Sequence, residues 1–513
     1  MHTKICSAST LGVNSIDIEV EVDLALGLLT FTIVGLPDTA IKESKQRIVT
    51  ALKNCGIKMP ERKITINLAP ADVKKEGTLF DLPIAIGIAQ SAGVIELSKQ
   101  FLDETIIVGE LSLDGAIRGV RGILPIAYDG LKRGKKRLIL PKDNALQAGL
   151  IKGIEIIGVE HLTELIRYLK GDLFVAPTIT PVHNEQDRPF KDENMSDVIG
   201  QTQAKRMLQI AAAGYHNILF IGSPGCGKTM LARRITSIMP SMSFDEIIAT
   251  SKVYSVGGKG GQEFTAVTAR PFRSPHHSIS AIGMVGGGAF PQPGELSLAH
   301  NGVLFLDELM EFNRSTLESL RQPLEQREVC ISRAQYAITF PANFLLIGAL
   351  NPCPCGFLGH PKRRCACSTH IIARYTSKLS GPLLDRFDLQ GSVPSVDYET
   401  IRQKTNQPAR SSEDLYKGVL IARAKQIARF GNNTTFNAHM SADMIQTFCP
   451  LSDEAENSIK KVFETLSLSM RGYHKLLKVA RTIADMENVE IIEQKHIQEA
   501  IMYRSLDKNL EKK

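Results

Sequence analysis

Two hydrophobic patterns alternate along the front third of the chain. Apolar and polar residues alternate over residues 16–25 and 63–70, which predicts half-buried strands. Apolar residues recur at helical spacing over residues 39–56, which predicts an amphipathic helix. Residues 105–122 fit two strands joined by a tight turn at Asp114-Gly115. We therefore expect residues 1–175 to form one compact α/β or α+β domain.

The pattern changes twice after this part of the chain. Residues 176–197 are rich in Pro, Asn, Asp and Glu and have no apolar periodicity, which predicts a linker. A helix pattern then leads into a short buried strand over residues 216–220, and a second helix pattern covers residues 230–239. A second α/β domain is therefore expected over residues 198–398.

Composition narrows the function classes only a little. The 513 residues are 43% hydrophobic and 22% charged, as in globular proteins, and the formal charge of +7 permits a polyanionic partner without requiring one. The start of the chain is not typical of a signal peptide, and no apolar run approaches the length of a membrane span, so we expect a cytoplasmic protein without membrane partners. The nine cysteines then indicate reduced thiols or metal ligands.

The strand over residues 216–220 leads into a phosphate-binding loop. Its sequence fits G-x-x-x-x-G-K-[ST], whose backbone N–H groups and lysine hold phosphates and whose hydroxyl binds Mg²⁺. The flanking strand and helix are the context that this motif requires. The alternative is a Gly-Pro turn between a strand and a helix. The expected nucleotide-binding residues are Gly222, Ser223, Pro224, Gly225, Cys226, Gly227, Lys228 and Thr229, with Thr229 as a Mg²⁺ ligand.

A second motif follows about eighty residues downstream. Residues 301–309 form a short apolar strand that ends in two acids. We expect Asp307 to bind Mg²⁺ and Glu308 to orient and deprotonate the water that attacks ATP. The alternative for Glu308 is an exposed acid at the end of a strand.

Four cysteines cluster within one short segment, in the sequence CPCGFLGHPKRRCAC. Cys353, Cys355, Cys365 and Cys367 could hold a structural Zn²⁺ ion in a tetrahedral site. However, C-x-C spacing is tighter than the usual zinc spacing. The alternative is a set of reduced cysteines packed as small apolar groups.

Taken together, these motifs resemble the magnesium-chelatase-like branch of the AAA+ ATPases, and more narrowly the YifB/ComM family. The segment PFRSPHH over residues 271–277, between the two nucleotide-binding motifs, carries the narrower resemblance. The resemblance implies a Lon-protease-like (ribosomal S5 domain 2-like) fold for residues 1–175, an AAA+ P-loop ATPase core, and a helical lid over residues 399–513. The position of the Lon nucleophile is Leu79 here, so we expect no protease activity from the first domain.

The same resemblance assigns further residues to the ATP site. Asn351 follows a strand at the position of the sensor asparagine, although an Asn before Pro can also simply form a turn. Arg386 matches the arginine finger that a neighbouring subunit would supply, and Arg471 matches a lid arginine that touches nucleotide. Such a finger implies a ring, and the family implies a homo-hexamer.

Two insertions suggest the substrate. A glycine-rich segment over residues 255–294 contains Arg273 and a His276-His277 pair, which we interpret as a pore loop rather than a zinc site. Residues 327–342 fit a hairpin with Arg333 at its tip, where an arginine suits a DNA phosphate, although an exposed turn with a solvated arginine is the alternative. Arg333 and Arg273 are the DNA-contact candidates.

These inferences lead to one functional expectation with three rivals. We expect an ATP-driven, Mg²⁺-dependent hexameric DNA motor that promotes branch migration on recombination intermediates in natural transformation, as the family resemblance implies. A chelatase-like metal-insertion motor, an ATP-dependent protease and a protein-remodelling ATPase remain as alternatives. Leu79 argues against the protease.

Overall fold

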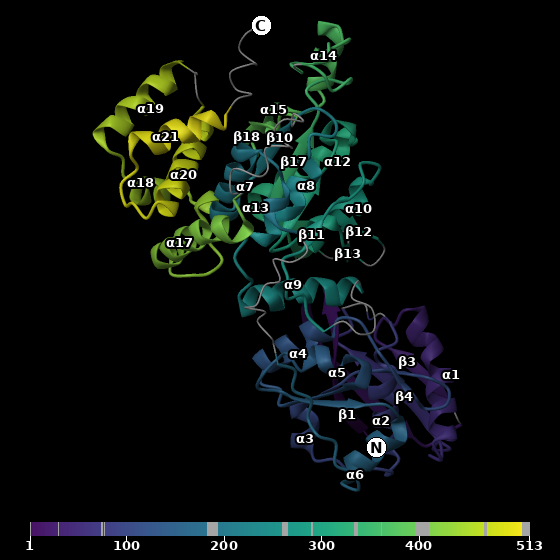
Figure 1. Ribbon diagram of the computed structural model, residues 1–513. Helices are drawn as coiled ribbons and strands as arrows, with labels where there is room; N and C mark the ends of the chain where they lie inside the picture. Colours follow the sequence, from purple (N-terminus) through teal and green to yellow (C-terminus); the bar gives the residue numbers. More distant parts are fainter. Residues whose placement is uncertain are drawn as a thin grey trace. The chain divides into compact units, whose positions relative to one another are not determined.

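A computed structural model describes most of the chain and divides it into two compact units (Figure 1). The first unit contains residues 1–184, 247–267 and 332–340, and the second contains residues 185–246, 268–331 and 341–513. The described residues are 2–28, 30–72, 75, 77–181, 193–258, 265–288, 291–332, 337–360, 362–395, 410–465 and 469–504. No helix within these ranges is long and apolar enough to cross a membrane.

The first unit combines two small sheets with helices. Its four-stranded sheet has the order β1-β2-β4-β3, and its three-stranded sheet, β5-β8-β9, is parallel. Buried and less buried residues alternate along β2, which places Ile18, Val20 and Val22 in the core as the sequence pattern predicts. The strands are β1 (His2–Leu11), β2 (Asn14–Ala25), β3 (Phe31–Val34), β4 (Lys63–Ala69), β5 (Thr105–Ile107), β8 (Arg137–Pro141) and β9 (Glu155–Val159).

The helices of the first unit include the one predicted over residues 39–56. The helix α1 begins after Asp38, whose carboxylate accepts a hydrogen bond from the backbone N–H of Ile41, and α2 is buried along nearly its whole length. The predicted hairpin at Asp114-Gly115 is present as the short strands β6 (Glu110–Leu111) and β7 (Ile117–Arg118). The helices are α1 (Thr39–Asn54), α2 (Asp81–Ser91), α3 (Lys99–Glu104), α4 (Ile123–Lys132), α5 (Lys142–Ala148) and α6 (Leu162–Lys170).

Two segments from the ATPase part of the sequence return to the first unit. Most of α9 (Phe244–Gly257) belongs to it, with Ile248 in an apolar core cluster and Lys252 3.1 Å from the carboxylate of Asp129. Residues 332–340 also belong to it. The glycine-rich insertion is therefore divided between the two units. Its composition does not predict this division, because the division depends on tertiary packing.

The second unit is built on a five-stranded parallel sheet in the order β11-β14-β17-β10-β18. Every residue of the central strands β14 and β17 is buried, as expected of a parallel sheet covered on both faces. The carboxyl ends of β10, β14 and β17 meet at one edge, where the nucleotide motifs begin. The strands are β10 (Ile218–Ile221), β11 (Phe272–Arg273), β14 (Val303–Leu306), β17 (Leu345–Leu350) and β18 (Leu389–Ser392).

Short helices and strands surround this sheet. The helix predicted over residues 230–239 is the short α8 (Lys228–Arg233), which tightens into a 3₁₀ turn over Arg234–Ser237. The other elements are α7 (Thr202–Gly214), α10 (Ala281–Val285), β12 (Gly286–Gly287), β13 (Gln292–Pro293), α11 (Glu295–Leu298), α12 (Arg314–Glu318), α13 (Arg321–Gln326), β15 (Glu328–Ser332), α14 (Thr369–Thr376) and α15 (Gly381–Leu384). The strand β16 (Ala337–Pro341) belongs mostly to the first unit. The strands β15 and β16 form the predicted hairpin, but Arg333 lies outside the described residues.

A helical bundle completes the second unit. Figure 1 shows α18 to α21, drawn in yellow, gathered together with α17 beneath them. Side chains of α7, α17, α20 and α21 share one apolar cluster with the sheet, so the bundle and the sheet have a common core. Met195, from the end of the expected linker, is fully buried in the same cluster. The helices are α17 (Ser412–Phe430), α18 (Ala442–Phe448), α19 (Asp453–Thr465), α20 (Met470–Met486) and α21 (Gln494–Met502).

Candidate active site

The phosphate-binding loop connects β10 to α8. Gly227 has a left-handed backbone (φ 92°), and a Cβ atom on Gly222 would lie 2.4 Å from the carbonyl oxygen of Val393. Lys228 is 92% shielded from solvent, and its ammonium group donates hydrogen bonds to the carbonyl oxygens of Gly222 (2.6 Å) and Ser223 (3.1 Å). The lysine is thus held inside the loop, at the place where phosphate oxygens would replace these carbonyls.

A cavity of about 390 Å³ lies at this edge of the sheet. Its size falls in the range of small-molecule sites. It is lined by the loop from Pro224 to Met230, by the two acids that follow β14, and by the end of β17. The fold therefore brings together the three motifs that are separate in the sequence.

The hydroxyl of Thr229 and the carboxylate of Asp307 meet in this cavity. The Thr229 hydroxyl donates a hydrogen bond of 2.6 Å to Asp307 Oδ2. Both groups are hard oxygen ligands of the kind that Mg²⁺ prefers, and Mg²⁺ is usually bound by one or two such groups together with phosphate oxygens. This pair fits the residues predicted to hold the ion.

Glu308 extends from the end of β14 into open space. Its backbone is left-handed (φ 50°), and its side chain is 57% exposed. One carboxylate oxygen lies 3.5 Å from Nδ1 of His277, which belongs to the PFRSPHH segment. The His276 and His277 rings have centroids 4.0 Å apart, and their planes are tilted by 35°. The conspicuous sequence segment therefore lies beside the predicted catalytic acid, which the spacing in the sequence does not reveal.

Asn351 follows β17 directly and faces the phosphate-binding loop. Its side-chain oxygen accepts a hydrogen bond of 3.1 Å from the Lys228 ammonium. On the opposite side of the loop, the Gln201 amide donates hydrogen bonds to the carbonyl oxygens of Cys226 (3.4 Å) and Pro394 (2.6 Å). Gln201 thus touches the phosphate-binding loop.

The two predicted arginines lie together, away from this cavity. Arg386 and Arg471 both pair with the carboxylate of Glu325, and the Arg471 contact measures 3.6 Å. Both line a second hollow of about 320 Å³ that also contains Lys475 and Lys478. Neither arginine is among the described residues that line the phosphate-loop cavity.

Charged residues of the first insertion have structural partners. Arg273 makes two hydrogen bonds to Glu295, of 2.7 and 2.8 Å. Arg270 is buried, pairs with Glu246 at 3.1 Å, and donates to the carbonyl oxygen of Asn301 at 2.7 Å. These contacts anchor the chain on either side of β11.

Two titratable groups of this unit have pKa values shifted by burial and partners. Burial, together with the charge of Arg270, lowers the pKa of His300 to about 4. Burial alone would raise the pKa of Asp388, but the hydrogen bond from His216 and the charge of Lys475 lower it to about 2. The neutral His300 accepts a hydrogen bond of 3.1 Å from the backbone N–H of Asn343.

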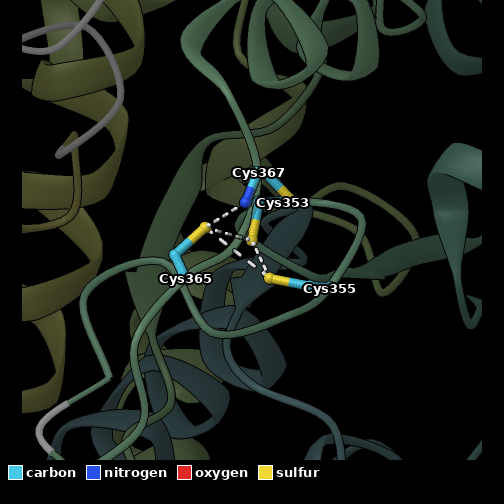
Figure 2. A group of neighbouring side chains, drawn as sticks. All are labelled: Cys353, Cys355, Cys365 and Cys367. Atoms are coloured by element: carbon cyan, nitrogen blue, oxygen red, sulfur yellow. Dashed lines mark hydrogen bonds between the residues drawn. The ribbon is translucent and has the colours of Figure 1, made fainter.

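The four clustered cysteines also come together. Figure 2 shows the thiols of Cys353, Cys355 and Cys365 pointing toward one another, with sulfur–sulfur distances of 3.3 to 3.6 Å. All four Sγ atoms, including that of Cys367, lie within 4.8 Å of one another. The backbone N–H of Phe357 lowers the pKa of the Cys355 thiol to about 6.

Leu79, at the predicted position of the Lon nucleophile, packs against the apolar core of the first unit. The neighbouring hydroxyl of Thr78 donates a hydrogen bond to Glu110. The Arg118 guanidinium donates to the Ser112 hydroxyl.

Three stretches of the chain match family descriptions of one protein. Residues 20–144 match "Subunit ChlI of Mg-chelatase", residues 194–401 match "Magnesium chelatase, subunit ChlI", and residues 409–504 match "Magnesium chelatase, subunit ChlI C-terminal". The chain is 44% identical to YifB of Escherichia coli strain K12 over 512 residues, which cover 99% of this chain and 97% of YifB. The chain belongs to the YifB/ComM family of magnesium-chelatase-like AAA+ proteins.

Two further relatives agree with this assignment. Competence protein ComM of Haemophilus influenzae is 43% identical over 513 residues, which cover 99% of this chain and 98% of ComM. Lon protease 2 of Bacillus subtilis is 31% identical over 130 residues, 24% of this chain and 22% of that protein. The predicted family and the α/β fold class with an AAA+ core are thereby confirmed, and family membership supports ATPase activity.

Proposed function

We propose that this YifB/ComM family member is an ATP-hydrolysing homo-hexameric DNA motor that promotes branch migration on recombination intermediates in natural transformation. The observation that carries the proposal is 43% identity to a competence protein over nearly the full length of both chains. Because identity extends through both units and the bundle, the proposal concerns the whole architecture rather than the ATPase motif alone.

In the proposed reaction, the loop around Lys228 binds the phosphates of ATP. Thr229 and Asp307, already in contact, would hold the Mg²⁺ ion, which neutralises charge on the phosphates. Glu308 orients and deprotonates the attacking water, and Asn351 fixes the position of the terminal phosphate.

The position of the two arginines supports the proposed ring. Arg386 and Arg471 share Glu325 on a surface apart from the phosphate-loop cavity, so we infer that both act on ATP bound by a neighbouring subunit. An arrangement in which each subunit completes the site of the next is head-to-tail, and such an arrangement forms a ring when the rotation between subunits closes.

For the DNA contact, we propose Arg333, which lies in the sequence between β15 and β16 and outside the described residues. Arg273 is the second candidate, because it would have to exchange its pair with Glu295 for a phosphate. Contacts of this kind are independent of base sequence and weaken with salt.

The test compares ATP hydrolysis with and without branched DNA in the wild type, Lys228→Ala and Glu308→Gln. We expect DNA to stimulate hydrolysis by the wild type, and both variants to lose hydrolysis while Glu308→Gln still binds ATP. Lys53→Ala and Glu61→Gln, two exposed positions of the first unit, are matched controls. If neither stimulation nor salt-sensitive DNA binding occurs, the proposed substrate is wrong. Stimulation by an unfolded polypeptide instead would favour the protein-remodelling alternative.

A further inference from the structure

The cysteine cluster has the dimensions of a tetrahedral metal site. A disulfide requires sulfur atoms about 2.05 Å apart, whereas four thiolates about 2.3 Å from one Zn²⁺ ion lie about 3.8 Å from one another. The distances of 3.3 to 3.6 Å among Cys353, Cys355 and Cys365 are close to the second value. Four sulfur ligands without oxygen or imidazole favour Zn²⁺ over Mg²⁺.

A backbone N–H group supports this geometry. The N–H of Cys367 donates a hydrogen bond of 3.4 Å to the sulfur of Cys365, two residues earlier. The sulfurs of the two C-x-C pairs lie within 4.8 Å of one another, so both pairs are directed at one centre.

The loop that carries the cysteines has little core of its own. Between Asn351 and Tyr375, the only buried residues among those described are Cys353 and Gly356. A polar loop of this kind cannot repay its conformational entropy by apolar burial, whereas a structural Zn²⁺ ion supplies folding free energy directly.

The same loop is in direct contact with the phosphate-binding loop. A Cβ atom on Gly356 would lie 2.3 Å from Cδ of Pro224, so Gly356 packs directly against the Pro224 ring, and its φ of 79° is left-handed. Cys353 lies two residues after Asn351, the residue that accepts a hydrogen bond from Lys228.

Both ends of the loop meet at Asn351. The helix α14 follows the last cysteine, and its buried Tyr375 returns to the start of the loop, where the phenol oxygen faces the backbone N–H of Asn351. The cysteine cluster therefore closes a loop that begins at Asn351, in the phosphate-loop cavity, and touches the phosphate-binding loop through Gly356.

We propose that Cys353, Cys355, Cys365 and Cys367 bind one Zn²⁺ ion, and that this ion holds Asn351 and Pro224 in place for ATP hydrolysis. The ion stabilises the conformation of the nucleotide site, and the cysteines are positioning residues rather than catalytic ones. The inference rests on the ATPase activity of the proposed function but not on DNA as its substrate.

The first test measures metal content and DNA-free ATPase activity of the full-length protein. We expect about one Zn²⁺ per chain in the wild type by elemental analysis. The variant Cys365→Ser/Cys367→Ser removes the two ligands farthest in sequence from Asn351. It should lose the ion and at least about tenfold in kcat. The matched control Cys6→Ser/Cys55→Ser changes two half-buried cysteines of the first unit and should retain both.

A second test uses wild-type protein, so that a folding defect of the variant cannot hide the answer. A mercurial thiol reagent releases the Zn²⁺, and its release is followed with a chromogenic chelator. Because coupling between two sites is reciprocal, ATP with Mg²⁺ should slow the release, and removal of the reagent followed by Zn²⁺ addition should restore hydrolysis.

Each failure has a separate meaning. Purified protein without Zn²⁺, or with iron in its place, overturns the metal assignment. If Zn²⁺ is present but can be removed without loss of DNA-free hydrolysis, the ion does not position the nucleotide site, and that part of the proposal is wrong. Absence of DNA stimulation affects neither result and contradicts only the proposed motor.

Discussion

The side-chain oxygen of Asn351 accepts a hydrogen bond of 3.1 Å from the ammonium group of Lys228. The two residues are far apart in the sequence and come together because β10 and β17 are adjacent parallel strands. This contact joins the group that binds phosphate to the group that would sense it, so a change at Asn351 should affect hydrolysis more than binding.

We expect Asn351→Ala to lower kcat for ATP by about 10²-fold, because a polar group that is aimed at developing charge contributes mainly in the transition state. Equilibrium binding of a fluorescent ATP analogue, measured in parallel, should change little. Asn54→Ala, at the exposed end of α1, is the matched control. An unchanged kcat in Asn351→Ala would mean that Asn351 only forms a turn before Pro352 and has no role in hydrolysis.

The contact between His277 and Glu308 leads to a second prediction. The Glu308 carboxylate is largely exposed, and His277 Nδ1 lies 3.5 Å from it, so the imidazole restricts where the carboxylate points. We expect His277→Ala to lower kcat by about tenfold with ATP binding retained, and His277→Gln, which keeps a donor, to recover part of the loss. The neighbouring variant His276→Ala should have the smaller effect. Equal losses in both alanine variants would mean that the histidines only support the loop.

The sequence predicts the residues of this site that belong to local motifs better than those brought together by the folding of loops. Lys228, Thr229 and Asp307 belong to motifs whose local spacing is tied to their chemistry, and the structure brings them together as expected. The partnership of His277 with Glu308 depends on how a loop folds over the end of β14, and nothing in the local spacing encodes it. The sequence also does not predict the packing of Gly356 on Pro224, because it is a contact between two loops.

The division of the chain shows the same limit. Alternating and helical patterns locate β2, α1 and the hairpin at Asp114-Gly115 correctly. They do not show that residues 247–267 and 332–340 join the first unit. An apolar residue such as Ile248 in α9 predicts burial, but it does not predict which residues it packs against.

A third prediction concerns acid stability. His300 is buried and neutral, with a pKa of about 4 in place of the ordinary 6.5. The unfolded chain therefore binds the proton more tightly, so the contribution of neutral His300 is complete above about pH 6.5 and is lost as the pH falls toward 4. The effect is about 3 kcal/mol in the free energy of unfolding.

We expect His300→Asn to reduce this acid loss, since an amide oxygen can accept the hydrogen bond of the Asn343 N–H without titrating. Thermal unfolding of the wild type and the variant between pH 7 and pH 4 measures the difference. His370→Asn, an exposed histidine in α14, should follow the wild type. Parallel curves for wild type and His300→Asn would show that other groups dominate the acid response.

The last prediction tests whether Arg386 serves a neighbouring subunit. In the second unit, Arg386 pairs with Glu325 outside the phosphate-loop cavity, so a subunit should lack the finger for its own ATP. Arg386→Ala and Lys228→Ala should each be inactive alone, the first without a finger and the second without a functional phosphate-binding loop. When the two proteins are mixed before assembly, an intact loop of one variant can meet an intact arginine of the other. About one quarter of the interfaces in an equal mixture then have both groups, so about one quarter of the wild-type ATPase activity should return.

Two variants that damage the same side, Lys228→Ala and Thr229→Ala, give the control and should not complement. Failure of the first pair to recover activity, with ring assembly shown by light scattering, would place the arginine in its own subunit's site or outside catalysis. The same mixing experiment with Arg471→Ala decides whether the lid arginine acts across the interface as well.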